Sequence, residues 1–438
     1  MALSADQEQA LQLFNEGKNI FITGLGGSGK SYLIQLFKTV VESKGKKIYL
    51  TALTGCAGIL LGPNAKTIHS WSGIGIGTSS LEETCQKIRS RGATTSLRWW
   101  RDADILVIDE ISMMSPTILE LLNSIGKILR NNSKPFGGIQ VVFAGDFFQL
   151  PPIGGASKDT PKYAFESPIW DEVIHSTVEL TYNHRQSDQI FQKILQEVRF
   201  SNLSKESIAI LESKKIKGNK LPVYFNNLPE NSNLTLPIKP TILYSRKADV
   251  DATNKQELEK LNNPLQTFIV TSVNANLIPK KQVKINELKI DTESNYIQSL
   301  NLCIAAQVML IINLDLSEGL ANGSRGVITS FSEKGLPIVE FLNGKTIEID
   351  YHTWYLSEHE SFGRKQIPLC IAYAITIHKS QGATLDYTLV DLGKSLFEDG
   401  QAYVALSRVK SLEGLFIYSL DVKKITSNKK VIEFYTML

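Results

Sequence analysis

The stretch NIFITGLGGSGKSYLIQLFKTVV, residues 19–41, decides the fold of the first part of this 438-residue chain. It opens with a short apolar run that is typical of a buried strand. The apolar residues of its second half recur at the spacing of one helix face: Leu33, Leu36, Phe37, Val40 and Val41. Between the two lies GLGGSGKS, which satisfies the pattern GxxxxGK[ST]. A strand, this loop and a helix in direct succession predict a phosphate-binding loop in an α/β domain.

The chemistry of such a loop explains its residue types. Glycines let backbone N–H groups turn toward phosphate oxygens, and the helix N-terminus adds positive potential. Lys30 would reach the β- and γ-phosphates of ATP, and Ser31 would ligate Mg²⁺. The predicted nucleotide-binding residues are Gly24, Gly26, Gly27, Ser28, Gly29, Lys30 and Ser31. A random chain of this length matches the pattern roughly two times in a hundred, so we favour the phosphate site over a glycine-rich turn.

Two further apolar runs end in polar residues of the kind that such a site needs. DILVIDE ends in Asp109 and Glu110, which could hold Mg²⁺ and take a proton from an attacking water. The alternative is an acid pair that only ends a strand. IQVVFAGDFFQLPP delivers Asp146 and Gln149, and Gln149 could meet the γ-phosphate or the lytic water. Ligands bind at this end of the strands in open α/β sheets.

The rest of the chain predicts a second α/β domain with an insertion. Residues 201–240 are polar and rich in Pro and Asn, which indicates a linker. An α/β pattern begins at TILYSRKADV, residues 241–250, and is interrupted between about 275 and 365 by short strands. Asn343-Gly344 would form the tight turn of a hairpin there.

Composition limits the class of protein but does not identify its binding partner. The net charge of +3 permits nucleic acid without requiring it. The four cysteines are far apart, which predicts neither a zinc site nor a disulfide framework and fits an intracellular setting. We expect no signal peptide at the N-terminus and no membrane span, because no run of about 20 apolar residues occurs.

The motifs together resemble the Pif-one type of DNA helicase, superfamily 1B, related more distantly to RecD and Dda. The stretch DEISMMSPTILELLNSIGKILRNNSKPFGGIQVVFAGDFFQLPP, residues 109–152, resembles that family's signature and third motif. TIHSWSGIGIG at 67–77 resembles the motif after the second strand. TIHKSQGATLDYTLVDL at 376–392 and GQAYVALSRVKSLEGL at 400–415 resemble the fifth and sixth motifs.

The resemblance implies two RecA-like P-loop NTPase domains. We expect domain 1A at 1–200, with a wedge insertion at about 72–98. Domain 2A would comprise 201–275 and 366–438, and an SH3-like β-barrel, domain 2B, would occupy 276–365. ATP would bind between the RecA-like domains, with single-stranded DNA across them and movement in the 5′-to-3′ direction. The direction of movement is implied by the family resemblance alone.

Several residues gain roles from the resemblance. Gln7 would contact adenine, although Ser4 and Gln7 also fit a helix capping box. Arg185 and Arg408 would reach the γ-phosphate as arginine fingers, where the alternative for either is a surface ion pair. His184 stands where the family pattern has an aromatic residue, which weakens the assignment of Arg185. Gly382, in the fifth motif, is added to the nucleotide-binding residues.

A track for single-stranded DNA needs cations or polar groups for phosphates and aromatic faces for bases. The predicted contacts from the first domain are Thr54, His69, Ser70 and Trp71, and those from the second are His378, Lys379 and Ser380. Either histidine taken alone would more often be structural.

Two other segments leave alternatives open. Residues 85–101 are either a basic DNA contact or a solvated face around a core pair, Trp99 and Trp100. Asn322 to Gly326 reads as a turn, with Arg325 as a lesser candidate for a DNA contact.

The motifs and the family resemblance together imply an ATP-driven, Mg²⁺-dependent 5′-to-3′ DNA helicase that unwinds duplex DNA, with G-quadruplexes and RNA:DNA hybrids as further candidate substrates. It would act on single-stranded and forked DNA in replication, repair, recombination or telomere maintenance, as a monomer that could dimerise on DNA. The rivals are a nucleotide or small-molecule kinase, which would need an acceptor pocket, and a DNA clamp that does not hydrolyse ATP.

Overall fold

The computed structural model divides the chain into two compact units. Unit 1 comprises Met1–Ser187 and Ser427–Leu438, and unit 2 comprises Asp188–Thr426. The described residues are 3–62, 65–75, 77, 79–90, 95–152, 163–186, 188–216, 238–277, 279–294, 296–315, 318–356 and 359–438.

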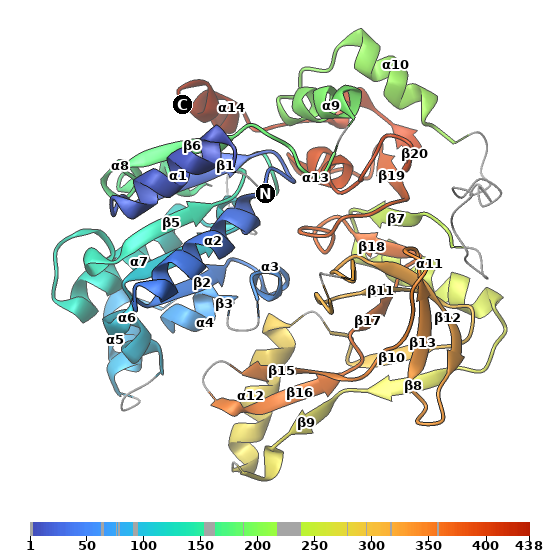
Figure 1. Ribbon diagram of the computed structural model, residues 1–438, viewed down its shortest axis with the longest axis horizontal. Helices are drawn as coiled ribbons and strands as arrows, with labels where there is room; N and C mark the ends of the chain where they lie inside the picture. The colour runs from blue at the N-terminus through green and yellow to red at the C-terminus, as the bar shows by residue number, and fades with distance from the viewer. Residues whose placement is uncertain are drawn as a thin grey trace. The chain divides into compact units, whose positions relative to one another are not determined.

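Unit 1 is built on a six-stranded parallel sheet with the order β3-β2-β4-β5-β1-β6 (Figure 1). The strands are β1 (Ile20–Gly24), β2 (Ile48–Ala52), β3 (Lys66–Thr67), β4 (Ile105–Asp109), β5 (Gln140–Ala144) and β6 (Ser176–Leu180). The predicted parallel α/β architecture is confirmed. Since β4, β5 and β1 are consecutive in the sheet, their carboxyl ends bring the acid pair, the Gln149 turn and the phosphate loop to one edge.

The helices of unit 1 lie before, between and after these strands in the sequence. They are α1 (Ala5–Asn15), α2 (Lys30–Ser43), α3 (Gly55–Leu60), α4 (Ile68–Ser72), α5 (Leu81–Ser90), α6 (Thr95–Asp102), α7 (Pro116–Arg130), α8 (Trp170–Val173) and α14 (Lys429–Thr436), with short 3₁₀ turns η1 (Ile111–Met113), η2 (Pro135–Gly138) and η3 (Ala164–Glu166). The predicted start of α7 is confirmed, because the Ser115 hydroxyl accepts from the Ile118 amide and Pro116 is the first helical residue. The buried face of α2 includes Ile34, which the sequence pattern did not single out.

Unit 2 contains a four-stranded parallel sheet with the order β18-β7-β19-β20. Its strands are β7 (Thr241–Tyr244), β18 (Ala374–Thr376), β19 (Thr388–Leu392) and β20 (Leu415–Leu420). The accompanying helices are α9 (Gln189–Arg199), α10 (Lys205–Ser213), α11 (Lys247–Lys260) and α13 (Gln401–Ser407), with the 3₁₀ turn η6 (Val422–Lys424). Helix α10 lies inside the stretch expected to be a linker, and residues 217–237 of that stretch lie outside the described residues.

An antiparallel β region interrupts this second α/β fold. A five-stranded sheet, β14-β13-β12-β11-β17, lies with a two-stranded sheet, β10-β8, and a three-stranded sheet, β15-β16-β9. Their bounds are β8 (Gln266–Ile269), β9 (Thr271–Val273), β10 (Ser299–Leu302), β11 (Gln307–Leu310), β12 (Arg325–Phe331), β13 (Pro337–Phe341), β14 (Thr346–Glu348), β15 (His352–Leu356), β16 (His359–Gln366) and β17 (Leu369–Ile371), with η5 (Ala275–Leu277) and α12 (Lys280–Glu293). Gly344, with φ of 82°, turns the chain between β13 and β14 as predicted.

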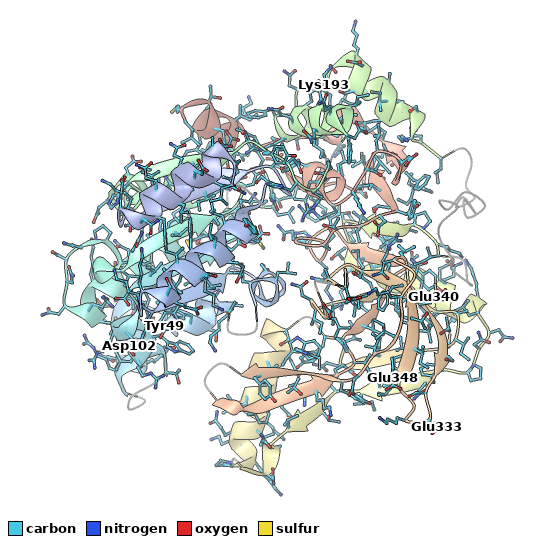
Figure 2. The ribbon with its side chains drawn as sticks, in the orientation of Figure 1. Tyr49, Asp102, Lys193, Glu333, Glu340 and Glu348 are labelled. Carbon is cyan, nitrogen blue, oxygen red and sulfur yellow. The ribbon has the colours of Figure 1, made fainter. Side chains whose placement is uncertain are left out.

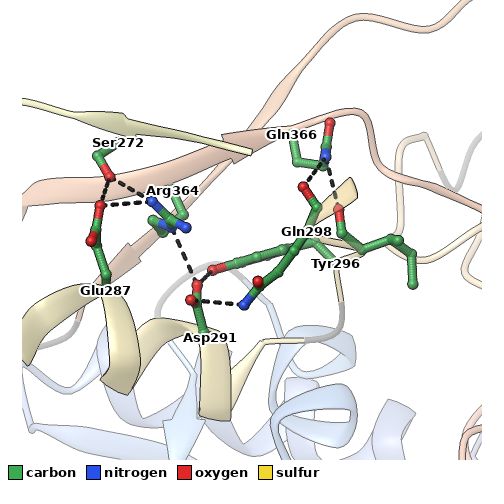
Figure 3. Close-up of polar contacts among 8 residues, drawn as sticks. Ser272, Glu287, Asp291, Tyr296, Gln298, Arg364 and Gln366 are labelled. Atoms are coloured by element: carbon green, nitrogen blue, oxygen red, sulfur yellow. Dashed lines mark hydrogen bonds and ion pairs between the residues drawn. The ribbon is translucent and has the colours of Figure 1, made fainter. Parts of the chain in front are cut away.

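One arginine ties together the three-stranded sheet and α12 (Figure 3). Arg364 of β16 donates to Glu287 of α12 at 2.8 Å and to Asp291 at 3.2 Å. It also donates to the hydroxyl of Ser272 in β9 at 2.7 Å, and Tyr296 donates to Asp291. A polar network therefore joins these elements of the β region.

The unit boundaries differ from the domain limits expected from the sequence. Unit 2 begins at Asp188, whose side chain accepts from the amides of Ile190 and Phe191 and so starts α9. Helix α14 belongs to unit 1, where the ring of Phe434 stacks on that of Phe165 at 4.3 Å. The β region begins with β8, about ten residues before the expected insertion.

Candidate functional site

The phosphate loop passes from β1 to α2 through glycines in the left-handed region. Their φ angles are 134° at Gly24, 91° at Gly27 and 92° at Gly29. A Cβ added at Gly27 would lie 2.4 Å from Cβ of Arg185, and one at Gly24 would lie 2.4 Å from the carbonyl oxygen of Leu180. The loop therefore requires glycine both for its backbone conformation and for its close packing against the end of β6 and the segment that follows it.

The polar groups of this loop suit a nucleotide phosphate. Lys30 Nζ donates to the carbonyl oxygens of Gly24 at 2.7 Å and Leu25 at 3.0 Å, and to Ser28 Oγ at 3.4 Å. Ser31 is exposed in the first turn of α2. An ammonium beside a glycine-rich loop at a helix N-terminus fits anionic phosphates, and a hydroxyl oxygen fits the ligand preference of Mg²⁺.

The acid pair lies at the carboxyl end of β4. Asp109 is 8% exposed and accepts from the backbone amide of Glu110 at 2.8 Å. Burial, followed by the charge of Glu110, raises the pKa of Asp109 to about 7, while Lys30 lowers it. Glu110 has a φ of 55°, a strained conformation that is common at functional sites. The lysine and the acid pair lie within electrostatic reach of each other, so the residues present fit a divalent cation.

Gln149 lies in the turn that follows β5. Its side chain is 4% exposed, and its Oε1 atom has no hydrogen-bond partner among the described residues. Its amide donates to the carbonyl oxygen of Asp146 at 2.9 Å. Asp146 is fully buried, and its carboxylate accepts from the Phe148 amide at 3.2 Å. Asp146 thus shapes the turn, and Gln149 retains an acceptor for a water or a ligand.

The segment after β6 is hydrogen-bonded to the phosphate loop. The amide of His184 donates to the carbonyl oxygen of Gly27 at 2.9 Å. The carboxamide oxygen of Asn183 accepts from the amides of Arg185 at 2.9 Å and Gln186 at 3.2 Å. The ring of His184 meets that of Tyr182 edge-on at 4.6 Å, so the imidazole provides a flat ring where the family pattern has an aromatic side chain.

Gln7 approaches the same loop from α1. The capping box with Ser4 is present, with hydrogen bonds of 3.1 and 3.3 Å. A Cβ at Gly29 would lie 2.9 Å from Gln7 Nε2. The amide group of Gln7 therefore combines the capping role with a place beside the phosphate loop, and the two roles are compatible.

The predicted DNA contacts of unit 1 divide into two groups. Thr54 caps α3 by accepting from the Ala57 amide at 3.2 Å, and His69 and Ser70 are half-buried in α4, where burial lowers the pKa of His69. Trp71 is 1% exposed, and its ring packs 5.7 Å from that of Tyr49, which Figure 2 labels. The expectation that Trp71 touches DNA is therefore corrected, because its ring belongs to the core of unit 1.

The open question about residues 85–101 is answered for the tryptophan pair. Trp99 and Trp100 are 5% and 0% exposed, and the Trp100 indole donates to the carbonyl oxygen of Ser72 at 3.0 Å. Both are core residues, while Arg98 and Arg101 are exposed. Residues 91–94, within the expected wedge, lie outside the described residues.

In unit 2, the fifth-motif residues occupy the turn after β18. Gly382 has a φ of 79°, and Lys379 is exposed. Burial lowers the pKa of His378, and Glu398 opposes this shift. The hydroxyl of Ser380 is buried and donates to the carbonyl oxygen of Ile377 at 2.7 Å, which corrects its assignment as a DNA contact.

The two predicted arginines of unit 2 are both buried. Arg408 follows α13, where its Nε donates to the carbonyl oxygen of Val404 at 3.2 Å and its Nη2 to Ser407 Oγ at 2.9 Å. Arg325 is 1% exposed and donates to the carbonyl oxygen of Lys239 at 3.0 Å and to Thr241 Oγ1 at 3.3 Å. The lesser expectation that Arg325 meets DNA is wrong, because its side chain lies inside unit 2.

The sequence pattern did not single out two residues that support the site. Asn183 fixes the backbone of Arg185, and its place in LTYNHRQ was the available signal. Tyr435 of α14 reaches the ends of β1 and β5, and no local pattern could reveal where that helix docks.

Known proteins resemble this chain over nearly its whole length. Residues 2–208 match the PIF1-like helicase family, and residues 285–331 match the 2B domain of DNA helicase Pif1. The chain is 36% identical over 445 residues to the ATP-dependent DNA helicase PIF1 of Xenopus laevis, covering 99% of this chain and 64% of that protein. The chain thus spans less than two thirds of that relative's length.

Solved structures give the same result. The crystal structure of Pif1 helicase from Candida albicans is 33% identical with a TM-score of 0.78, and the match covers 100% of this chain and 99% of that one. Pif1 helicase from Bacteroides in complex with ADP-AlF3 and single-stranded DNA is 26% identical with a TM-score of 0.69. This match covers 100% of this chain and 97% of that one. Among the described residues, no helix combines the length and the apolar character that a membrane span requires.

Proposed function

The chain belongs to the Pif1-like DNA helicase family, and from this premise we propose that it is an ATP-dependent motor that moves 5′ to 3′ on single-stranded DNA and unwinds duplex DNA. One observation carries the proposal: Lys30, the acid pair and Gln149 follow three adjacent strands, and the segment of Arg185 is hydrogen-bonded to the loop of Lys30.

The domain assignment follows the same premise. The parallel sheet of unit 1 corresponds to domain 1A, with the wedge at about 72–98, and the parallel sheet of unit 2 corresponds to domain 2A. The antiparallel β region corresponds to domain 2B, for which an SH3-like barrel is proposed. The match of residues 285–331 to the 2B domain supports this last assignment.

The proposed chemistry uses the residues of the phosphate loop and of the neighbouring strand ends. Lys30 binds the β- and γ-phosphates, and Gln7 contacts adenine. Mg²⁺, held by Ser31 and Asp109, would neutralise charge on the phosphates. Glu110 takes a proton from the attacking water, and Gln149 Oε1, which accepts no hydrogen bond from the described residues, orients that water.

Positive charge at the γ-phosphate completes the proposed site. Arg185 is fixed beside Gly27, which supports its role as one arginine finger. Arg408 and Gly382 are assigned from their motifs, with Arg408 as the finger that unit 2 supplies. Such fingers are worth roughly 10³–10⁵ in turnover in related phosphate chemistry, so hydrolysis should depend on the DNA-bound state.

The remaining contacts with single-stranded DNA are proposed for Thr54, His69 and Ser70 of unit 1 and for His378 and Lys379 of unit 2. A forked DNA substrate and dimerisation on DNA are supported by the structure of a 27% identical protein, with a TM-score of 0.67, that concerns unwinding at forked double-stranded DNA by two coordinating Pif1 helicases. The reducing intracellular setting, action on G-quadruplexes or RNA:DNA hybrids, and a role in replication, repair, recombination or telomere maintenance rest on the sequence and the family resemblance alone.

The test compares ATP hydrolysis with and without single-stranded DNA, and strand separation on duplexes with a 5′ or a 3′ tail. We expect DNA-stimulated hydrolysis and unwinding from the 5′ tail only, both lost in the Glu110→Gln variant. Equal hydrolysis with and without DNA would contradict the motor, and unwinding from the 3′ tail would contradict the direction. Phosphate transfer to an acceptor molecule would instead indicate the kinase alternative.

A further inference from the structure

The C-terminal helix α14 delivers a buried hydroxyl to the edge of the sheet that carries the phosphate loop. Tyr435 is 9% exposed, and its Oη lies 2.5 Å from Thr23 Oγ1. The same oxygen accepts from the Phe147 amide at 3.2 Å and donates to Asp146 Oδ1 at 3.4 Å. When the Thr23 hydroxyl donates to Tyr435, the phenolic oxygen accepts two hydrogen bonds and donates one. All three contacts are then satisfied.

These contacts lie where the strand ladder ends. The pairing of β1 with β5 runs as far as Ile22 and Ala144, and the amide of Gly145 donates to the carbonyl oxygen of Ile22 at 3.1 Å. Beyond this point the backbones diverge toward the phosphate loop on one side and the Gln149 turn on the other. Just past the last ladder bond, the Tyr435 hydroxyl bridges the Thr23 side chain on the β1 side and the Phe147 amide and Asp146 carboxylate on the β5 side.

The bridge is next to both parts of the nucleotide site. Thr23 precedes Gly24, where the phosphate loop begins. The backbone carbonyl oxygen of Asp146 accepts from the backbone amide of Gln149 at 2.9 Å, so Asp146 also forms the start of that turn. The Tyr435 hydroxyl therefore contacts a residue beside the phosphate loop and residues at the start of the Gln149 turn.

We propose that Tyr435 is a positioning residue for ATP hydrolysis, whose hydroxyl holds the Gln149 turn in register with the phosphate loop. This inference rests on the proposed ATPase function. It assigns Tyr435 an effect on turnover rather than on nucleotide binding, because Lys30 and the glycines bind phosphate through their own backbone and side-chain groups.

The Tyr435→Phe variant removes only the hydroxyl and keeps the ring. We expect kcat for ATP hydrolysis in the presence of single-stranded DNA to fall about tenfold, as for loss of one positioned hydrogen bond, with KM for ATP changed less than about twofold. The Thr23→Val variant should show the same split between kcat and KM. The double variant should lose little more than either single one, because both changes break one shared contact.

Tyr418→Phe is the matched control, since Tyr418 is 52% exposed and lies in β20 of unit 2, and it should retain the wild-type kcat. Thermal unfolding of each variant measures the folded fraction. A Tyr435→Phe protein with wild-type kcat, or with a loss fully matched by its unfolded fraction, would overturn the inference. Wild-type protein that does not hydrolyse ATP would overturn the proposed function as well, so the two failures are distinguishable.

Discussion

The backbone amide of His184 donates to the carbonyl oxygen of Gly27 at 2.9 Å, so the segment that carries Arg185 is held by the phosphate loop itself. Asn183 adds a second contact, since its carboxamide nitrogen donates to the carbonyl oxygen of Gly26 at 3.4 Å. A cation proposed to act on the γ-phosphate is therefore positioned by the same loop that binds the phosphate.

Gly27→Ala should disrupt this arrangement. The new methyl group would lie 2.4 Å from Cβ of Arg185, at a residue whose φ is 91°. We expect a loss of roughly 2–5 kcal/mol in unfolding free energy from backbone strain and overpacking, and a fall in ATP hydrolysis of about 100-fold or more because the loop and Arg185 move apart. Chemical denaturation and steady-state hydrolysis measure the two effects.

Gly45→Ala is the control for the cost of backbone strain alone. Gly45 also has a positive φ, 68°, but nothing lies within 4 Å of an added Cβ. That variant should lose roughly 1–2 kcal/mol and keep its turnover. If both variants hydrolyse ATP equally well, the packing of Gly27 against Arg185 does not matter for the reaction.

Removal of Mg²⁺ with EDTA should abolish ATP hydrolysis, and Asp109→Asn should raise the Mg²⁺ concentration needed for half-maximal rate about tenfold or more. The reason is that the buried Asp109 would lose the charge that attracts a divalent cation. Asp104→Asn serves as the control, because Asp104 is exposed at the opposite end of the same strand and accepts from the Lys47 amide at 2.8 Å. Equal Mg²⁺ dependence in the two variants would remove Asp109 from the metal site.

Much of the site could be predicted because its signals are local. The phosphate loop, Asp109 and Gln149 each directly follow a short apolar run, and a parallel sheet gathers the carboxyl ends of its strands at one edge. Three strands of the unit 1 sheet, β1, β4 and β5, could be placed in this way, and the family resemblance supplied the connection between motifs.

Other features depend on distant partners, which no local pattern reveals. The apolar run at 369–376 is divided between β17 in the antiparallel sheet and β18 in the parallel one. Trp71 is predicted from its motif to contact DNA, but its ring packs against those of Tyr49 and Trp100. Helix α14 is next to unit 2 in sequence, but the aromatic ring of Phe434 finds its partners in unit 1.

Arg364→Ala should loosen the junction of β9, α12 and β16 without reaching the nucleotide site. Arg364 is 11% exposed, and its loss would leave Glu287 and Asp291 near each other without their shared cation. We expect a cost of roughly 2–4 kcal/mol, seen as faster amide hydrogen exchange in α12. Lys365→Ala, at the adjacent exposed position, should leave that exchange unchanged. Equal exchange in both variants would show that the network does not stabilise the junction.

Lowering the pH from about 7 to about 5 should lower the Tm, in part through His352. Burial lowers the pKa of His352, whose ring meets that of Trp354 edge-on at 4.6 Å. Below the ordinary histidine pKa the unfolded chain binds a proton that the folded protein does not, so stability is full above that pKa and falls as the pH drops. His352→Phe keeps a ring against Trp354 but cannot titrate, so its Tm should fall less. A Tm that falls equally in both proteins would contradict this role.

Lys379→Ala should weaken binding to single-stranded DNA through a phosphate contact. Lys379 is exposed in the turn after β18, and its amide donates to Thr376 Oγ1 at 3.2 Å, so the backbone of the turn is fixed while the side chain extends outward. Loss of one phosphate contact should lower the magnitude of the slope of log K against log salt by about 0.7 on a single strand.

Lys255→Ala is the control, because Lys255 is exposed on α11, and it should leave both affinity and slope unchanged. Fluorescence anisotropy with a labelled oligonucleotide at several salt concentrations measures this slope, and equal slopes for the wild-type protein and Lys379→Ala would exclude Lys379 from the DNA track.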